Sequence, residues 1–164
     1  LCVHIGHELY GSDRSFALSV KTLQKTFADT EIDVLLTEQA KTGPIQSILT
    51  GIRGKINYRD FGLISKSDIR KFKFRRLLKA FTDISQVVKT MNQYDIVYVN
   101  TMMILDFMLA SRFSKAKTII HIREIPSGLP KLIFSLIFRF SKASVFFKLA
   151  GTFRSFHFMN GRNS

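Results

Sequence analysis

The chain has 164 residues, of which 46% are hydrophobic and 23% are charged; this suffices for one ordinary core in a single domain and excludes a disordered chain. Lys and Arg number 25 against 12 Asp and Glu, so the net charge is +13. This excess favours an anionic partner, such as nucleic acid, an acidic membrane surface or a phosphorylated ligand.

Short apolar segments rich in β-branched residues alternate along the chain with segments of helical periodicity. The predicted strands are residues 1–5, 32–36, 56–59, 95–99, 118–121 and 143–147. The predicted helices are residues 12–27, 45–49, 67–91, 104–113 and 131–140. Because this alternation is typical of parallel strands joined by crossover helices, the expected fold class is α/β, a Rossmann-like parallel sheet flanked by helices.

A basic and aromatic stretch occupies one end of the longest predicted helix. Residues 66–79 contain seven Lys and Arg against the single acid Asp68, with Phe72 and Phe74 between them. This pattern suits an anionic membrane surface, and a plain solvated helix face is the alternative. Nucleic acid is not the expected partner, because no helix-turn-helix or RNA-binding signature accompanies the stretch. The candidate membrane-contact residues are Arg70, Lys71, Lys73, Arg75, Arg76 and Lys79.

The sequence predicts neither a signal peptide nor a membrane-spanning segment. No basic stretch precedes the apolar residues 1–5, and His7 and Glu8 follow them too soon. Ser135, Arg139 and Lys142 interrupt the longest apolar region, residues 132–147, which falls short of the roughly 20 residues that a spanning helix needs. We therefore expect a cytoplasmic location.

Metal and nucleotide motifs are both missing from the sequence. The only cysteine is Cys2, and no HExxH motif or His/Cys cluster occurs, so we expect no disulfide, no bound metal and no cofactor. The loop of residues 6–12 lies between a predicted strand and a predicted helix, where backbone N–H groups favour an anion. However, Ser12 stands where a Walker loop has Lys, and Glu8 stands where the dinucleotide fingerprint has Gly.

Three ionisable residues follow the predicted strand 118–121. His121, Arg123 and Glu124 lie at its carboxyl end, the edge at which open α/β sheets bind ligands. A structural histidine, bonded to a backbone carbonyl, is the alternative for His121. The neighbouring charges favour a ligand site.

Three segments together resemble one family, the N-terminal domain of family-four glycosyltransferases with the two-domain GT-B architecture. They are residues 9–15 (LYGSDRS), 94–101 (YDIVYVNT) and 120–125 (IHIREI). Their order and spacing over residues 1–147 are similar to the family's glycine loop, its D-I-V-x-x-N strand and its H-x-R-E strand end. The resemblance implies one half of a GT-B fold, with residues 148–164 as an atypical tail or the start of an interdomain segment.

The resemblance also implies the residues of a cleft for acceptor and donor. Gly11, Ser12 and Asp13 correspond to the glycine-rich loop, near the donor phosphates and the acceptor, although Ser12 replaces the family's second glycine. Asn100 and His121 would line the acceptor side, and Arg123 and Glu124 would hold the loop that carries them. No catalytic residue is assigned, because the nucleotide-sugar site and the paired glutamates belong to a second domain that is expected to be missing from this chain.

The expected function is therefore that of half a glycosyltransferase, inactive alone. The whole enzyme would transfer a sugar from a nucleotide-sugar to a cell-envelope glycan or lipid-linked acceptor, at the inner face of a membrane. Such enzymes often retain the anomeric configuration without a metal. The alternative is a non-catalytic basic module that binds an anionic membrane or a partner protein.

Overall fold

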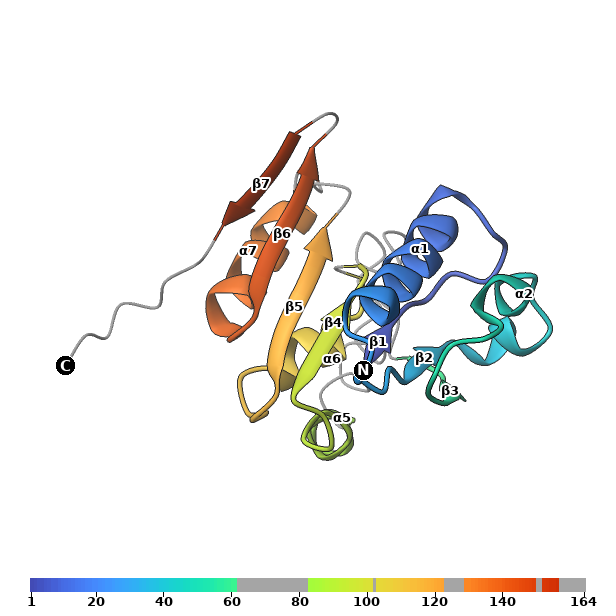
Figure 1. Ribbon diagram of the computed structural model, residues 1–164. Coiled ribbons are helices and arrows are strands. Elements are labelled where there is room, and N and C mark those ends of the chain that lie inside the picture. The colour runs from blue at the N-terminus through green and yellow to red at the C-terminus, as the bar shows by residue number, and fades with distance from the viewer. Residues whose placement is uncertain (62–82, 102, 123–128, 150–151, 157–164) are drawn as a thin grey trace.

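The structure of the chain is a computed structural model that describes residues 1–61, 83–101, 103–122, 129–149 and 152–156 (Figure 1). Its centre is a seven-stranded sheet in the order β3-β2-β1-β4-β5-β6-β7. The strands are β1 (Cys2–Val3), β2 (Val34–Leu36), β3 (Ile56–Tyr58), β4 (Ile96–Val99), β5 (Lys117–Ile122), β6 (Ser144–Leu149) and β7 (Thr152–Phe156). Strands β1 to β6 pair in parallel, which confirms the expected α/β, Rossmann-like class.

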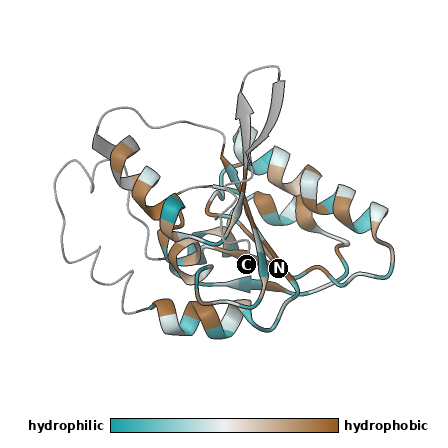
Figure 2. Ribbon diagram, turned by 90° about the vertical axis from the view of Figure 1, so that its left-hand side faces the viewer, coloured by the Kyte–Doolittle hydropathy of each residue, from teal (hydrophilic) through white to brown (hydrophobic). Residues whose placement is uncertain are grey.

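Helices lie on both faces of this sheet, as Figure 2 shows from the side. One face carries α1 (Gly11–Thr26) and α2 (Ile45–Leu49), preceded by the short 3-10 helix η1 (Glu38–Lys41). The other face carries α5 (Ile84–Met91), α6 (Leu105–Ala110) and α7 (Leu129–Phe140). This arrangement follows from crossover connections, because each helix must return the chain to the start of the next parallel strand.

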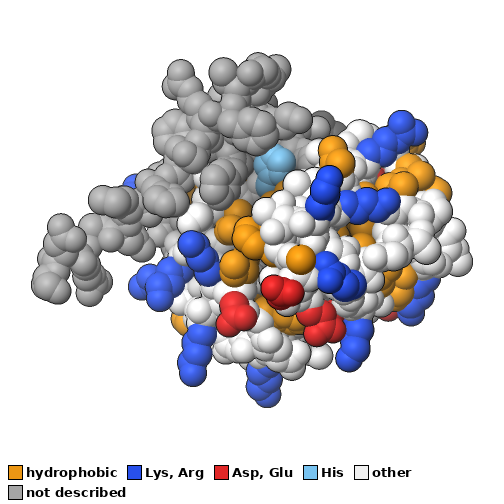
Figure 3. Space-filling view, viewed as in Figure 1, with side chains coloured by type: hydrophobic (Ala, Val, Ile, Leu, Met, Phe, Trp, Pro, Cys, Tyr) orange, Lys and Arg blue, Asp and Glu red, His pale blue; other side chains and the backbone are white. Residues whose placement is uncertain are grey.

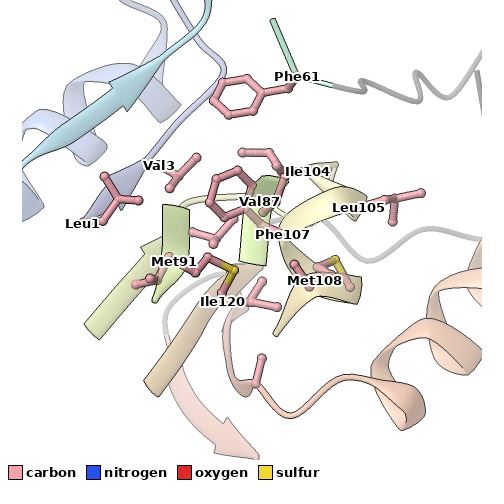
Figure 4. Close-up of a cluster of buried hydrophobic side chains, with 14 of the residues drawn as sticks. Leu1, Val3, Phe61, Val87, Met91, Ile104, Leu105, Phe107, Met108 and Ile120 are labelled. Atoms are coloured by element: carbon pink, nitrogen blue, oxygen red, sulfur yellow. The ribbon is translucent and has the colours of Figure 1, made fainter. Parts of the chain in front are cut away.

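Alternating side chains of the strands supply two separate cores. In β4, Val97 and Val99 are fully buried in the larger core, together with Phe107 of α6. Tyr98, between the two valines, packs toward the smaller core around Phe16 of α1. Figure 4 shows the larger core, where side chains of α5 and α6 meet those of the strands. Each large apolar side chain buried in this way stabilises the fold by about 1.5–3 kcal/mol.

The chain reverses its direction of travel across the sheet at β1. Strands β2 and β3 follow on one side of β1, whereas β4, β5 and β6 follow on the other. Such a reversal leaves a crevice outside the carboxyl ends of the two central strands, because the connections leave them toward opposite faces. The carboxyl edge of β1 and β4 is therefore the part of this fold best suited to hold a ligand.

The structure differs from the sequence prediction in the length of some elements and at the end of the sheet. Strand β1 and helix α6 are shorter than predicted, and only residues 84–91 of the predicted helix 67–91 belong to a described helix, α5. Strand β6 extends to Leu149, and β7 pairs with it antiparallel inside the expected tail of residues 148–164. A hairpin of this kind needs only a two-residue connection and completes the pairing of an otherwise open strand edge.

On the face that Figure 3 shows, Lys and Arg side chains are spread over the described part of the surface, and several acidic side chains lie close together near its lower centre. Within the part of the chain that the structure describes, no helix is long and apolar enough to cross a membrane.

Candidate functional site

A row of polar residues lies at the carboxyl edge of the three central strands. In the register of the sheet, Val3, Val99 and Ile120 are neighbours on β1, β4 and β5. The next position along each strand is His4, Asn100 and His121. Parallel pairing therefore brings residues that are about a hundred positions apart in sequence onto one edge, on the face that carries α1.

Hydrogen bonds connect this row into one chain of side chains. The Nδ2 atom of Asn100 lies 3.0 Å from Nδ1 of His4. The hydroxyl of Tyr98 donates to Oδ1 of Asn100 at 3.1 Å and lies 2.8 Å from Nδ1 of His121. At the other end, Nε2 of His4 lies 2.8 Å from Oδ1 of Asp13. The network thus runs from α1 across β1 and β4 to β5.

The hydrogen-bond donors in this network determine which nitrogen carries the proton in each neutral histidine ring. Because the amide of Asn100 donates to Nδ1 of His4, the His4 proton is on Nε2 and points at the Asp13 carboxylate. Because the Tyr98 hydroxyl already donates to Asn100, it must accept its second bond from Nδ1–H of His121. The lone pair of a neutral His121 ring is then on Nε2.

Asp13 anchors the network at the start of α1. Its Oδ1 atom accepts a hydrogen bond from the Ser12 hydroxyl at 3.0 Å, and its Oδ2 atom accepts one from the backbone N–H of Tyr10 at 3.1 Å. Burial alone would raise the pKa of Asp13. The hydrogen bonds that Asp13 accepts from His4, Ser12 and the Tyr10 N–H, together with the electrostatic attraction of the His4 ring, outweigh burial and hold the pKa of Asp13 below its ordinary value.

Close packing holds the His4 ring in place. His4 is buried and stacks on the ring of Phe16, with 4.5 Å between the centroids. A Cβ atom added to Gly6 would overlap Oδ1 of Asp13 and lie 2.6 Å from Nε2 of His4. Residue 6 must therefore be glycine for the His4–Asp13 contact to form.

The loop of residues 6–12 already has an anion at the start of α1. The carboxylate of Asp13 occupies the first turn, where the helix dipole favours negative charge. A phosphate placed there would compete with this carboxylate and be repelled by it. The same loop holds Leu9 in the left-handed backbone region, at φ 68°, a conformation that costs about 1–3 kcal/mol for such a residue.

The structure places five of the seven predicted cleft residues on one edge. Asp13, Asn100 and His121 belong to the network, and Ser12 bonds to Asp13. Gly11 begins α1 beside them and is exposed, with no atom within 4 Å of a Cβ added there. The other two, Arg123 and Glu124, lie outside the described residues. So do all the predicted membrane-contact residues, Arg70, Lys71, Lys73, Arg75, Arg76 and Lys79.

Sequence reasoning missed the two residues that join the others, His4 and Tyr98. Each lies in a predicted apolar strand, residues 1–5 or 95–99, whose pattern indicates a place in the sheet and no further role. The sequence does contain a signal for His4, because a histidine directly after the buried residues Cys2 and Val3 of β1 needs a polar partner inside the protein.

A further polar group follows β2 on this edge: the Thr37 hydroxyl is buried and has no hydrogen-bond partner among the described residues.

The polar row consists of side chains that can donate and accept hydrogen bonds. Among the residues that the structure describes, no three His, Cys, Asp or Glu side chains gather closely enough to bind a metal ion. In comparisons with known proteins, the chain matches no protein-family model, no curated protein and no solved structure. The proposed function therefore depends on the geometry and on the motifs.

Proposed function

We propose that this domain is the acceptor-side half of a glycosyltransferase that moves a sugar from a nucleotide-sugar to a cell-envelope glycan or lipid-linked acceptor. One observation carries the proposal: the network from Asp13 through His4, Asn100 and Tyr98 to His121 lies at the carboxyl edge where the sheet reverses direction. Imidazole, amide and hydroxyl groups can both donate and accept hydrogen bonds, as recognition of a sugar requires. The resemblance of three segments to family-four enzymes supports the same function.

In this proposal the two ends of the network have different tasks. His121, which is half-buried, faces the acceptor, and Gly11 leaves open space at the start of α1 through which the acceptor enters. Asp13, His4 and Asn100 are positioning residues, because all three are buried and act on His121 through Tyr98. Since the Asp13 carboxylate repels phosphate at this helix start, the nucleotide diphosphate is bound mainly by a second domain. Catalysis is then mostly the alignment of acceptor and donor across the cleft.

The proposed enzyme works in the cytoplasm at the inner face of a membrane. A net charge of +13 attracts the domain to anionic headgroups, and a lipid-linked acceptor would require that location. The charge equally favours a second candidate function, a non-catalytic basic module that docks on an anionic membrane or an acidic protein. The two candidates differ in whether the polar network binds a sugar.

The experiment that tests the proposal is a titration of the chain, labelled at histidine and tyrosine, with saccharides and with UDP-glucose, followed by NMR. The chain has four histidines, so their signals can be assigned one by one. We expect saccharides to shift the signals of His121 and Tyr98, with little effect on His7. The Asn100→Ala variant should bind more weakly.

Three outcomes would contradict the proposal. Saccharides that leave His121 unmoved would show that the network is structural. UDP without a sugar, if it produced the full shift, would place the nucleotide rather than the acceptor on this edge. Turnover of UDP-glucose by the chain alone would show that no second domain is needed.

A further inference from the structure

Helix α7 presents a row of apolar side chains to solvent. Leu132, Leu136 and Phe140 follow one another at intervals of four residues and are 59%, 60% and 46% exposed. Residues four apart lie on the same side of a helix. Phe113, from the turn after α6, extends this row: it is 59% exposed, and its ring centroid is 5.9 Å from that of Phe140. We call these four residues the α7 face.

The α7 face is not needed for the core. The opposite side of the helix performs that task, because Phe134 is buried, and Ile137 and Phe138 pack against the larger core. A single exposed leucine on a protein surface is ordinary. A continuous row of two leucines and two phenylalanines points to a binding surface instead, since exposed apolar patches are uncommon on monomeric proteins.

Basic side chains surround the α7 face. Arg139 and Lys142 lie within and just after the helix, and Arg112 and Lys115 flank Phe113; all four are exposed. The sequence has no Asp or Glu between residues 107 and 123, and none after Glu124. An apolar row with a cationic border and no acids is the pattern of helices that lie in the plane of an anionic bilayer. A second copy of the chain fits less well, because its cations would meet these cations.

We propose that the α7 face docks on an anionic membrane, an assignment that rests on the membrane association proposed above. The helix has 12 residues, about 18 Å of length, and lies parallel to the surface. Its leucines and the two phenylalanines enter the boundary between headgroups and acyl chains, and the four basic residues contact lipid phosphates. Because α7 links β5 to its parallel neighbour β6, it starts at the carboxyl edge of the sheet, so the first turn of a docked α7 lies beside that edge at the membrane surface.

The chain itself supplies matched controls. Leu18 of α1 is 66% exposed and Phe27 at the end of α1 is 55% exposed, and α1 lies on the other face of the sheet. Sedimentation with phosphatidylcholine vesicles that contain phosphatidylglycerol should show a loss of binding of roughly tenfold for Leu136→Gln and for Phe113→Ser, because each removes a large apolar side chain from the bilayer. Leu18→Gln and Phe27→Ser should bind as the parent does.

Charge should matter on the same face. Lys142→Gln should weaken binding about fivefold, since a basic residue near an anionic surface contributes about that factor, and Lys21→Gln on α1 should not. Pure phosphatidylcholine vesicles should bind the chain far less. Circular dichroism melts should show that all variants fold, because every exchanged side chain is exposed.

Two results would overturn this assignment. In one, Leu136→Gln and Leu18→Gln bind vesicles equally well. In the other, analytical ultracentrifugation shows that Leu136→Gln dissociates a dimer of the parent chain while vesicle binding stays the same, which would make the α7 face a contact between copies. Either result leaves the saccharide titration of His121 unaffected, so a failure here is distinguishable from a failure of the proposed function.

Discussion

The Nε2 atom of His4 lies 2.8 Å from Oδ1 of Asp13, and both side chains are buried. This contact joins the first strand of the sheet to the first turn of α1. Through His4, the start of that helix is connected to Asn100 and so to β4 and β5. A change at Asp13 should therefore affect both stability and the distant His121.

Replacing Asp13 by Asn should destabilise the protein at neutral pH by about 2 kcal/mol, because a charge-assisted buried hydrogen bond is lost. The pKa of Asp13 is lower in the folded protein than the value of about 3.9 in unfolded chains. Its carboxylate therefore stabilises the fold fully above that pH, and the stabilisation is lost as the pH falls through the folded pKa. Urea unfolding followed by circular dichroism should show the parent and Asp13→Asn converging in acid.

The exposed Asp29 provides the control for this measurement. Asp29→Asn changes the net charge by the same amount without removing a buried bond, so its free energy of unfolding should stay within about 0.5 kcal/mol of the parent. A gap between the parent and Asp13→Asn that is equally wide at pH 3 and pH 7 would show that the carboxylate charge is not what stabilises the contact.

Removing the Tyr98 hydroxyl should release His121 from its fixed tautomer. Tyr98→Phe deletes the group that receives Nδ1–H of His121, so the His121 proton should redistribute between its two nitrogens, which nitrogen-15 NMR of the ring detects. The stability should fall by about 1 kcal/mol. Tyr94→Phe, which removes a hydroxyl bonded to Asp33 instead, is the matched control. Identical His121 spectra in the parent and in Tyr98→Phe would contradict the proton positions derived above.

The sheet could be predicted from the sequence because its strands are short apolar runs separated by helical patterns. The same reasoning placed Asn100 and His121 on one edge, since parallel strands end together. The partners of these residues could not be predicted in this way. His4 reaches Asp13 only because α1 packs Phe16 under the imidazole ring, and this is a tertiary contact.

Two other features depend on tertiary structure in the same manner. Residues 152–156 show no alternation of apolar and polar residues, and they form β7 as the partner of the outer edge of β6. Helix α7 is apolar around most of its circumference, and its sequence does not show which side packs on the sheet. Only the structure shows that Phe134 packs into the core and that Leu132 and Leu136 are therefore exposed on the other side of the helix.

The two glycines at the ends of the loop should respond in opposite ways to alanine. Gly6→Ala puts a methyl group where the Asp13 carboxylate lies, so it should break the His4–Asp13 contact and cost about 1–3 kcal/mol. Gly11→Ala meets open space in the first turn of α1 and should stabilise the protein by up to about 1 kcal/mol. Thermal melts of both variants check this. A Gly6→Ala protein as stable as Gly11→Ala would show that the carboxylate moves aside freely.

The basic segment of residues 66–79, which lies outside the described residues, is predicted to strengthen vesicle binding through its Lys and Arg side chains, with apolar contact from Phe72 or Phe74. The test variant replaces Arg70, Lys73, Arg75 and Arg76 by Gln. The control variant, of equal net charge, replaces the exposed Arg14, Lys21, Lys25 and Lys55 by Gln. Because each basic residue near an anionic surface contributes about 1 kcal/mol, the test variant should bind vesicles that contain phosphatidylglycerol more weakly by orders of magnitude, and the control variant only slightly more weakly.

The difference between the two variants should shrink in salt, since the Debye length falls from about 10 Å at 0.1 M to about 3 Å at 1 M. Equal binding by the two variants would show that the segment is a solvated surface and that only the overall charge attracts the protein.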